Sequence, residues 1–172
     1  MLSAALGLEN ARLISLCGAG GKTTMMFALA REFVARGERV LITTTTKMAR
    51  EEAAGAAPAE RGAHLLFSGL TPYGRKLTGI GPELVNALRR AGEFDRILVE
   101  ADGAARRPLK ASAPHEPVIP SATDALIAVA GLNGLGLPLR EVNVFRAEVW
   151  AELTGTRLGS PVTPASIAGM AL

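Results

Sequence analysis

GAGGKTT occupies residues 18–24, directly after the apolar run LISLC at 13–17 and before a segment whose apolar residues recur at helical spacing. A polyphosphate is held chiefly by main-chain N–H groups that converge on it from a tight turn, and glycines permit such a turn. Strand, glycine-rich turn and helix in this order are the context that a phosphate-binding loop requires. The predicted phosphate-binding residues are Gly18, Ala19, Gly20, Gly21, Lys22, Thr23 and Thr24.

Side-chain chemistry agrees with this interpretation. Lys22 is predicted to reach the terminal phosphates as a point charge, while the Thr23 hydroxyl ligates the magnesium that bridges them. The first glycine of the pattern G-x-x-x-x-G-K-[ST] falls on Leu16, so the loop is a shorter variant. A plain strand-to-helix turn is the alternative, and it leaves a lysine followed by two threonines unexplained. We therefore expect ATP or GTP, with Mg²⁺, as the cofactors.

The flanking periodicity predicts the fold. Apolar residues from Met26 to Val34 follow the i, i+3, i+4, i+7 spacing of an α-helix, Gly37 follows as a stop, and 40–44 is rich in β-branched residues. Strand, helix and strand within about thirty residues form a βαβ unit, which builds parallel sheets. We expect an α/β fold, the three-layer P-loop NTPase type with a mainly parallel central sheet, as a single domain over residues 1–172.

Further elements are expected downstream. Residues 64–68 could form a short strand, a helix is predicted between Pro82 and Gly92, and a strand at 97–100. The continuously apolar run at 125–130 predicts a buried, central parallel strand. Residues 48–62 are interpreted as a short helix or a mobile surface segment.

The strand at 97–100 ends in acid and resembles a Walker B segment, in which a carboxylate at a strand end serves the magnesium shell or orients water. Glu100 and Asp102 are two residues apart, and the sequence does not say which holds the metal and which acts as a base. An ordinary Asp-Gly turn is the alternative for Asp102. Lys22, Glu100 and Asp102 are the predicted catalytic residues, and Thr23, Glu100 and Asp102 are the predicted metal ligands.

Two more segments are expected near the phosphates. The strand at 40–44 is followed by Thr45, Thr46 and Lys47, and the proline-rich stretch 103–120 is too long for a routine connection. Simple β-propensity and a solvated crossing loop are the respective alternatives. The predicted substrate-contacting residues are Thr45, Thr46, Lys47, Arg106, Lys110, His115 and Glu116.

Composition narrows the partners. The chain has 172 residues, a net charge of +3, one cysteine and 4% aromatic residues. One cysteine excludes an internal disulfide and suits the cytoplasm, where we expect the protein. Few aromatics argue against a stacking surface for nucleic acid. No apolar run approaches 18 residues, so we expect no membrane partner.

Three segments together carry a family resemblance: GAGGKTT at 18–24, TTTTKM at 43–48 and VEADGAARRPLKASAPHEPVIP at 99–120. They resemble the YqeC-type accessory proteins of selenium-dependent molybdenum hydroxylases, also described as selenium cofactor biosynthesis proteins. The resemblance implies a P-loop nucleotide-binding fold and a role in maturing such a hydroxylase, with the hydroxylase or its cofactor as a partner. The third segment is the most specific, because P-loop proteins at large do not share it.

The carboxyl end departs from that family. Thr163 and Pro164 have the features of a helix start, yet the chain ends at Leu172, whereas family members look longer. We therefore expect a truncated chain whose last helix is incomplete. No Asn-Lys-x-Asp motif for reading guanine occurs, so the base preference stays open.

Three functions remain open from the sequence. The first is a magnesium-dependent NTPase or phosphotransferase that assists hydroxylase maturation. The second is a nucleotide-dependent module that delivers or chaperones a cofactor with little turnover. The third is a small-molecule kinase or ligase, because the short loop also resembles the phosphate loop of Mur-type ligases.

Overall fold

A computed structural model describes residues 1–51, 53 and 62–170 of the chain. Its centre is a sheet of five strands in the order β4-β2-β7-β1-β9, and every neighbouring pair is parallel. The strands are β1 (Leu13–Gly18), β2 (Val40–Thr44), β4 (Ala63–Leu65), β7 (Arg96–Glu100) and β9 (Ala125–Val129). The parallel arrangement brings the carboxyl ends of β1, β2 and β7 to one edge, where ligands of such sheets bind.

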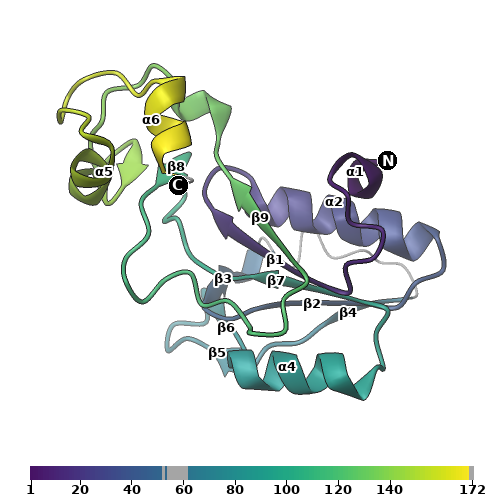
Figure 1. The fold of residues 1–172 in the computed structure, drawn as a ribbon. Helices are drawn as coiled ribbons and strands as arrows, with labels where there is room; N and C mark the ends of the chain where they lie inside the picture. The colour runs from purple at the N-terminus through teal and green to yellow at the C-terminus, as the bar shows by residue number, and fades with distance from the viewer. Residues whose placement is uncertain (52, 54–61, 171–172) are drawn as a thin grey trace.

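Helices cover both faces of this sheet. Helix α2 (Lys22–Ala35) lies on one face and α4 (Pro82–Ala91) on the other (Figure 1). Strand side chains alternate between the two faces, so Leu98 packs in the core under α2, whereas Ile97 and Val99 pack in the core with α4. The predicted three-layer α/β architecture with a parallel sheet is confirmed.

The predicted position of one strand is wrong. We expected residues 125–130 to form a central strand, but among the described strands β9 pairs with β1 alone and forms an edge of the sheet. Its residues alternate between half-buried and exposed, and Leu126 keeps 51% of its surface exposed. A short apolar run of alanine, leucine, isoleucine and valine satisfies the composition of either position, which is why periodicity did not separate them.

A small antiparallel sheet extends from the carboxyl end of β2. It consists of β3 (Lys47–Ala49), β5 (Gly69–Leu70) and β6 (Lys76–Thr78), in the order β3-β6-β5. Of the segment 64–68, for which a strand was predicted, the first two residues belong to β4, a strand of the five-stranded sheet. Much of the segment predicted over 48–62 lies outside the described residues, and its described part begins in β3.

The last third of the described chain packs around its own core. Strands β8 (Leu109–Lys110) and β10 (Val144–Phe145) pair in parallel beside α5 (Ala147–Thr154) and α6 (Pro164–Gly169). This cluster lies beyond the arrowhead of β9 in Figure 1. Its core is centred on Trp150, 2% exposed. The expectation of a single domain over the whole chain stays a prediction.

The remaining short elements are α1 (Leu2–Ala5), against α2, and a 3₁₀ turn at Leu132–Gly134. Helix α6 begins as predicted, because Thr163 and Ser166 form a reciprocal capping box and Pro164 occupies the first helical turn. Within the described residues, none of the helices has the length and apolarity needed to cross a bilayer.

Candidate functional site

The loop between β1 and α2 has the conformation that its glycines predict. Gly18, Gly20 and Gly21 have φ values of 95°, 77° and 127°, which residues other than glycine rarely adopt. Gly20 also needs to lack a side chain, because a Cβ there would lie 2.5 Å from the carbonyl oxygen of Pro108. The loop therefore packs closely against the backbone of the segment that follows β7.

Lys22 is the first residue of α2 and is almost fully buried, with 5% of its surface exposed. Its ammonium donates to the carbonyl oxygen of Gly18 at 2.6 Å, closing the loop on itself. It also forms an ion pair of 3.1 Å with Oδ1 of Asp102. The lysine is thus held at the helix start, where the helix dipole favours anions.

Asp102 is enclosed completely, with no exposed surface. Its Oδ2 accepts from the Gly18 amide at 3.0 Å and pairs with the Lys110 ammonium at 2.8 Å. Its Oδ1 accepts no hydrogen bond among the described residues, so the charge of Lys22 compensates it. Two lysines and one loop amide therefore surround the carboxylate that the sequence predicted as a metal ligand or base. That assignment stays a prediction.

Glu100, the other predicted acid, is the last residue of β7 and contacts the start of α2. Its Oε2 accepts a hydrogen bond of 2.8 Å from the Thr23 hydroxyl, and both residues line a cleft. A hydroxyl and a carboxylate in contact are hard oxygen donors of the kind Mg²⁺ accepts, with phosphate oxygens and water completing its shell. The residues present therefore fit a magnesium nucleotide. Among the described residues, no cluster of three His, Cys, Asp or Glu forms a separate metal site.

The threonine-rich end of β2 lies beside Glu100, and its hydroxyls are engaged. Thr44 donates to the Glu100 carbonyl oxygen at 2.7 Å, and Thr45 donates to the Val118 carbonyl oxygen at 2.7 Å. Thr46 lies 3.3 Å from the Thr44 hydroxyl. Lys47 is exposed and lines the cleft. Of the residues predicted here, only Lys47 is among those that line the cleft.

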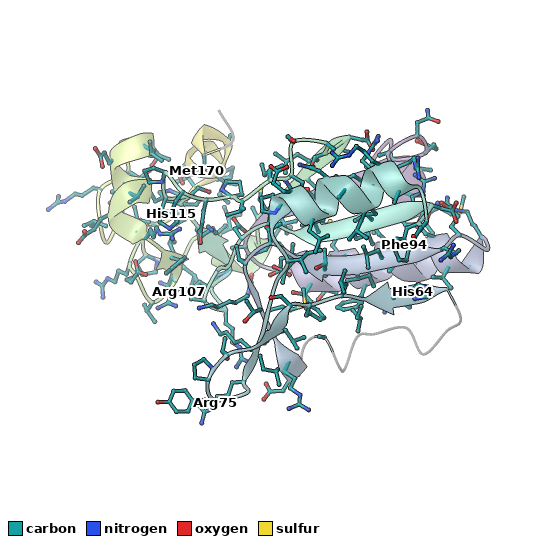
Figure 2. The ribbon with its side chains drawn as sticks, turned by 90° about the horizontal axis from the view of Figure 1, so that it is seen from below. His64, Arg75, Phe94, Arg107, His115 and Met170 are labelled. Atoms are coloured by element: carbon teal, nitrogen blue, oxygen red, sulfur yellow. The ribbon has the colours of Figure 1, made fainter. Side chains whose placement is uncertain are left out.

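Three of the residues predicted from the loop 103–120 lie away from the cleft. Lys110 is buried and joins Asp102 to Glu116, with a Nζ to Oε2 distance of 2.9 Å to the latter. Glu116 also pairs with Arg146 at 2.9 Å. His115 is exposed near the carboxyl-terminal cluster (Figure 2). Lys110 and Glu116 therefore connect Asp102, which contacts the β1–α2 loop, to that cluster.

This connection is stabilised by charge. Partial burial alone would raise the pKa of Glu116, but hydrogen bonds from Lys110 and Arg146 outweigh it and lower that pKa below its ordinary value. Arg146 also lies over the ring of Phe145, 4.5 Å from its centroid. Sequence reasoning missed Arg146, because nothing in the local pattern at 144–147 relates it to a loop thirty residues earlier.

The cleft itself has a volume of about 1080 Å³ and lies between the start of α2, β3, β6 and the loop 103–107. Arg75 and Arg107 reach into this end of the molecule, far from His64 and Phe94 (Figure 2). The basic side chains that line it are Lys22, Arg31, Lys47, Arg75, Lys76, Arg106 and Arg107. Sequence reasoning did not assign Arg31, Arg75 or Lys76 to the site.

Cys17 lies next to the loop and is half-buried. Burial raises the pKa of its thiol, and the nearby charge of Asp102 raises it further. The thiol is therefore protonated at neutral pH, the form in which it is a poor nucleophile.

Comparison with known proteins identifies the family. The sequence profile described as "YqeC protein" matches residues 14–148, from β1 through the start of α5. The chain belongs to the YqeC family. A YqeC relative from Escherichia coli (strain K12), named "Uncharacterized protein YqeC", is 39% identical over 155 residues, which cover 83% of this chain and 60% of the relative.

The chain thus spans about three fifths of the length of this YqeC relative. No solved structure matches it. The family match covers the β1–α2 loop, Glu100, Asp102 and the basic residues of the cleft, so all of them belong to the part of the chain that matches the YqeC sequence profile.

Proposed function

We propose that this protein binds ATP or GTP with Mg²⁺ at the β1–α2 loop, and that it hydrolyses or transfers the terminal phosphate during maturation of a selenium-dependent molybdenum hydroxylase. The observation that carries the first part is the hydrogen bond between the Thr23 hydroxyl and Glu100 at the start of α2. The maturation role rests on the family resemblance alone.

Each residue has a part in this proposal. Amides of the loop 18–21 and the helix start bind phosphate oxygens, and Lys22 leaves the Gly18 carbonyl oxygen to reach them. Magnesium, when bound, neutralises developing charge on the phosphates. Thr23 and Glu100 would hold it. Of the two acids, the proposal gives Glu100 the metal and Asp102 the positioning of Lys22, because lysines enclose Asp102.

The volume of the cleft favours phosphate transfer to an acceptor over hydrolysis. Ligand pockets usually measure about 300–1,000 Å³, and this cleft, at about 1080 Å³, is slightly larger. A kinase-like or ligase-like reaction needs room for an acceptor beside the nucleotide. Phosphate release that depends strictly on an added acceptor would agree with transfer, whereas release into water without one would favour hydrolysis.

The substitution Lys22→Ala tests the site. Charged hydrogen bonds contribute about 1.5–3 kcal/mol, so nucleotide affinity should fall by about 10- to 150-fold. Isothermal titration calorimetry with Mg·ATP and Mg·GTP measures this, after circular dichroism has verified that the variant is folded. Arg90→Ala, which removes an exposed cation from α4, is the matched control and should bind as the wild type does.

Thr23→Ala is the second variant, because it leaves the buried ion pair of Lys22 intact. It should raise the magnesium concentration needed for nucleotide binding. If both variants are folded and bind either nucleotide with wild-type affinity, the site is not where the proposal puts it.

A further inference from the structure

We propose that the cleft binds a second ligand beside the nucleotide, a small molecule that carries phosphate groups. Its contacts come from a basic wall that consists of Lys47, Arg75, Lys76, Arg106 and Arg107. This inference rests on the proposed function, since it assumes that the nucleotide occupies the β1–α2 loop. It adds the chemical class of the acceptor.

The charge balance of the cleft is the first argument. Among the described residues that line it, seven side chains are cations and two, Glu51 and Glu100, are carboxylates. Lys22 can be set aside because Asp102 neutralises it, and six cations still face two acids. A magnesium nucleotide carries only about two net negative charges, because the metal offsets part of the polyphosphate charge. The cleft therefore attracts more anionic charge than one nucleotide brings.

The origin of the cations is the second argument. The basic wall belongs to elements other than the phosphate loop: Lys47 begins β3, and Lys76 begins β6, which pairs with it. Arg106 and Arg107 come from the loop after β7. Converging like charges repel each other, and a concave surface of one sign concentrates a field that captures anions. A solvated face would instead spread such residues apart.

Arg107 is oriented by the fold. Its Nε donates to the Glu141 carbonyl oxygen at 2.5 Å and its Nη1 to the Ala105 carbonyl oxygen at 3.0 Å. Both acceptors are neutral, so these hydrogen bonds constrain the position of the guanidinium without offsetting its positive charge. By contrast, the contact between Arg106 and Glu51 at 3.4 Å is exposed and contributes little.

Phosphate groups on a small molecule suit this wall better than a nucleic acid does. Phe27 is the one aromatic residue among the described lining residues, and it is only 1% exposed. A single strand needs aromatic faces on which its bases stack, and none is available here. Lysine and arginine side chains are typical ligands of phosphate groups.

Calorimetry on the full chain tests the proposal, with fructose 1,6-bisphosphate as the probe because it carries two phosphate groups. The protein is first saturated with Mg²⁺ and a non-hydrolysable ATP analogue, so that the β1–α2 loop is filled. We expect the probe to bind with a dissociation constant below about 1 mM. The double substitution Arg75→Ser/Lys76→Ser should weaken probe binding at least about tenfold more than it weakens nucleotide binding.

The matched control is Arg90→Ser/Arg157→Ser, which removes two exposed cations elsewhere and should leave probe binding within about twofold of wild type. The proposal is overturned if the saturated wild type binds no probe, or if both double variants weaken it equally. Equal losses of probe and nucleotide in the Arg75/Lys76 variant also overturn it, because the wall then serves the nucleotide. If the nucleotide does not bind but the probe binds through Arg75 and Lys76, the proposed function fails and the anion site stands.

Discussion

At the residue scale, Asp102 shows how a buried charge can order a loop. Its oxygens meet the Gly18 amide and the ammonium groups of Lys22 and Lys110. Each of these groups would be costly to bury alone. The carboxylate therefore stabilises the loop conformation and holds Lys22 at the start of α2.

Asp102→Asn should destabilise the protein by about 3–5 kcal/mol, because it leaves the buried Lys22 without its charged partner and leaves Lys110 with Glu116 alone. Urea unfolding followed by circular dichroism measures the change. Glu93→Gln, an exposed acid after α4, serves as the control and should change stability by less than about 0.5 kcal/mol. A change below about 1 kcal/mol at Asp102 would mean that the lysines find other partners.

At the scale of elements, the β1–α2 loop depends on the segments that it contacts. Gly20 packs against Gly131, which follows β9, and against the carbonyl oxygen of Pro108. These three segments are far apart in sequence, and their backbones meet without intervening side chains. The loop is thus shaped from outside as well as by its own glycines.

Gly20→Ala should therefore cost more than a glycine substitution with the same backbone strain. Gly37 provides the comparison, because its φ of 82° is close to the 77° of Gly20 and a Cβ there would meet nothing within 4 Å. We expect Gly20→Ala to be the less stable of the two by about 1–3 kcal/mol and to lose nucleotide binding. Equal unfolding midpoints in urea would contradict the close packing.

At the scale of the whole molecule, a series of ion pairs joins the start of α2 to the carboxyl-terminal cluster. It runs from Lys22 through Asp102, Lys110 and Glu116 to Arg146. Movement of Lys22 toward a phosphate would change the electric field at Asp102 and at the other ion pairs of this series.

Acid should weaken the link at Glu116. Its pKa in the folded protein is lowered, so its contribution to stability is present above the ordinary pKa of a glutamate and is lost as pH falls through the folded value. Glu116→Gln should therefore reduce the loss of stability between neutral pH and about pH 3. Urea unfolding at both pH values measures it, with the exposed Glu148→Gln as control. An unchanged loss in Glu116→Gln would show that other acids account for it.

Local patterns were sufficient to predict the elements around the β1–α2 loop. Apolar spacing and glycines predicted β1, α2 and β2. The apolar run that ends in an acid predicted that Glu100 lies at the carboxyl end of β7. The same patterns did not separate the edge strand β9 from a central one, since both accept an apolar run. They also did not assign Arg75 and Lys76, because a turn between two short strands carries no sign of what it faces.

The sequence by itself determined the glycine-rich turn between β1 and α2 and the parallel sheet, because glycine freedom and apolar periodicity act between residues close along the chain. The sequence profile also determined the family. Only the tertiary structure decided that Glu100 meets Thr23 while Asp102 faces Lys22 and Lys110. Alternation along a continued strand would place residues 100 and 102 on the same face, but β7 ends at Glu100 and the chain leaves the strand conformation before Asp102. The basic wall likewise exists only after folding, since its cations come from segments that meet across the cleft.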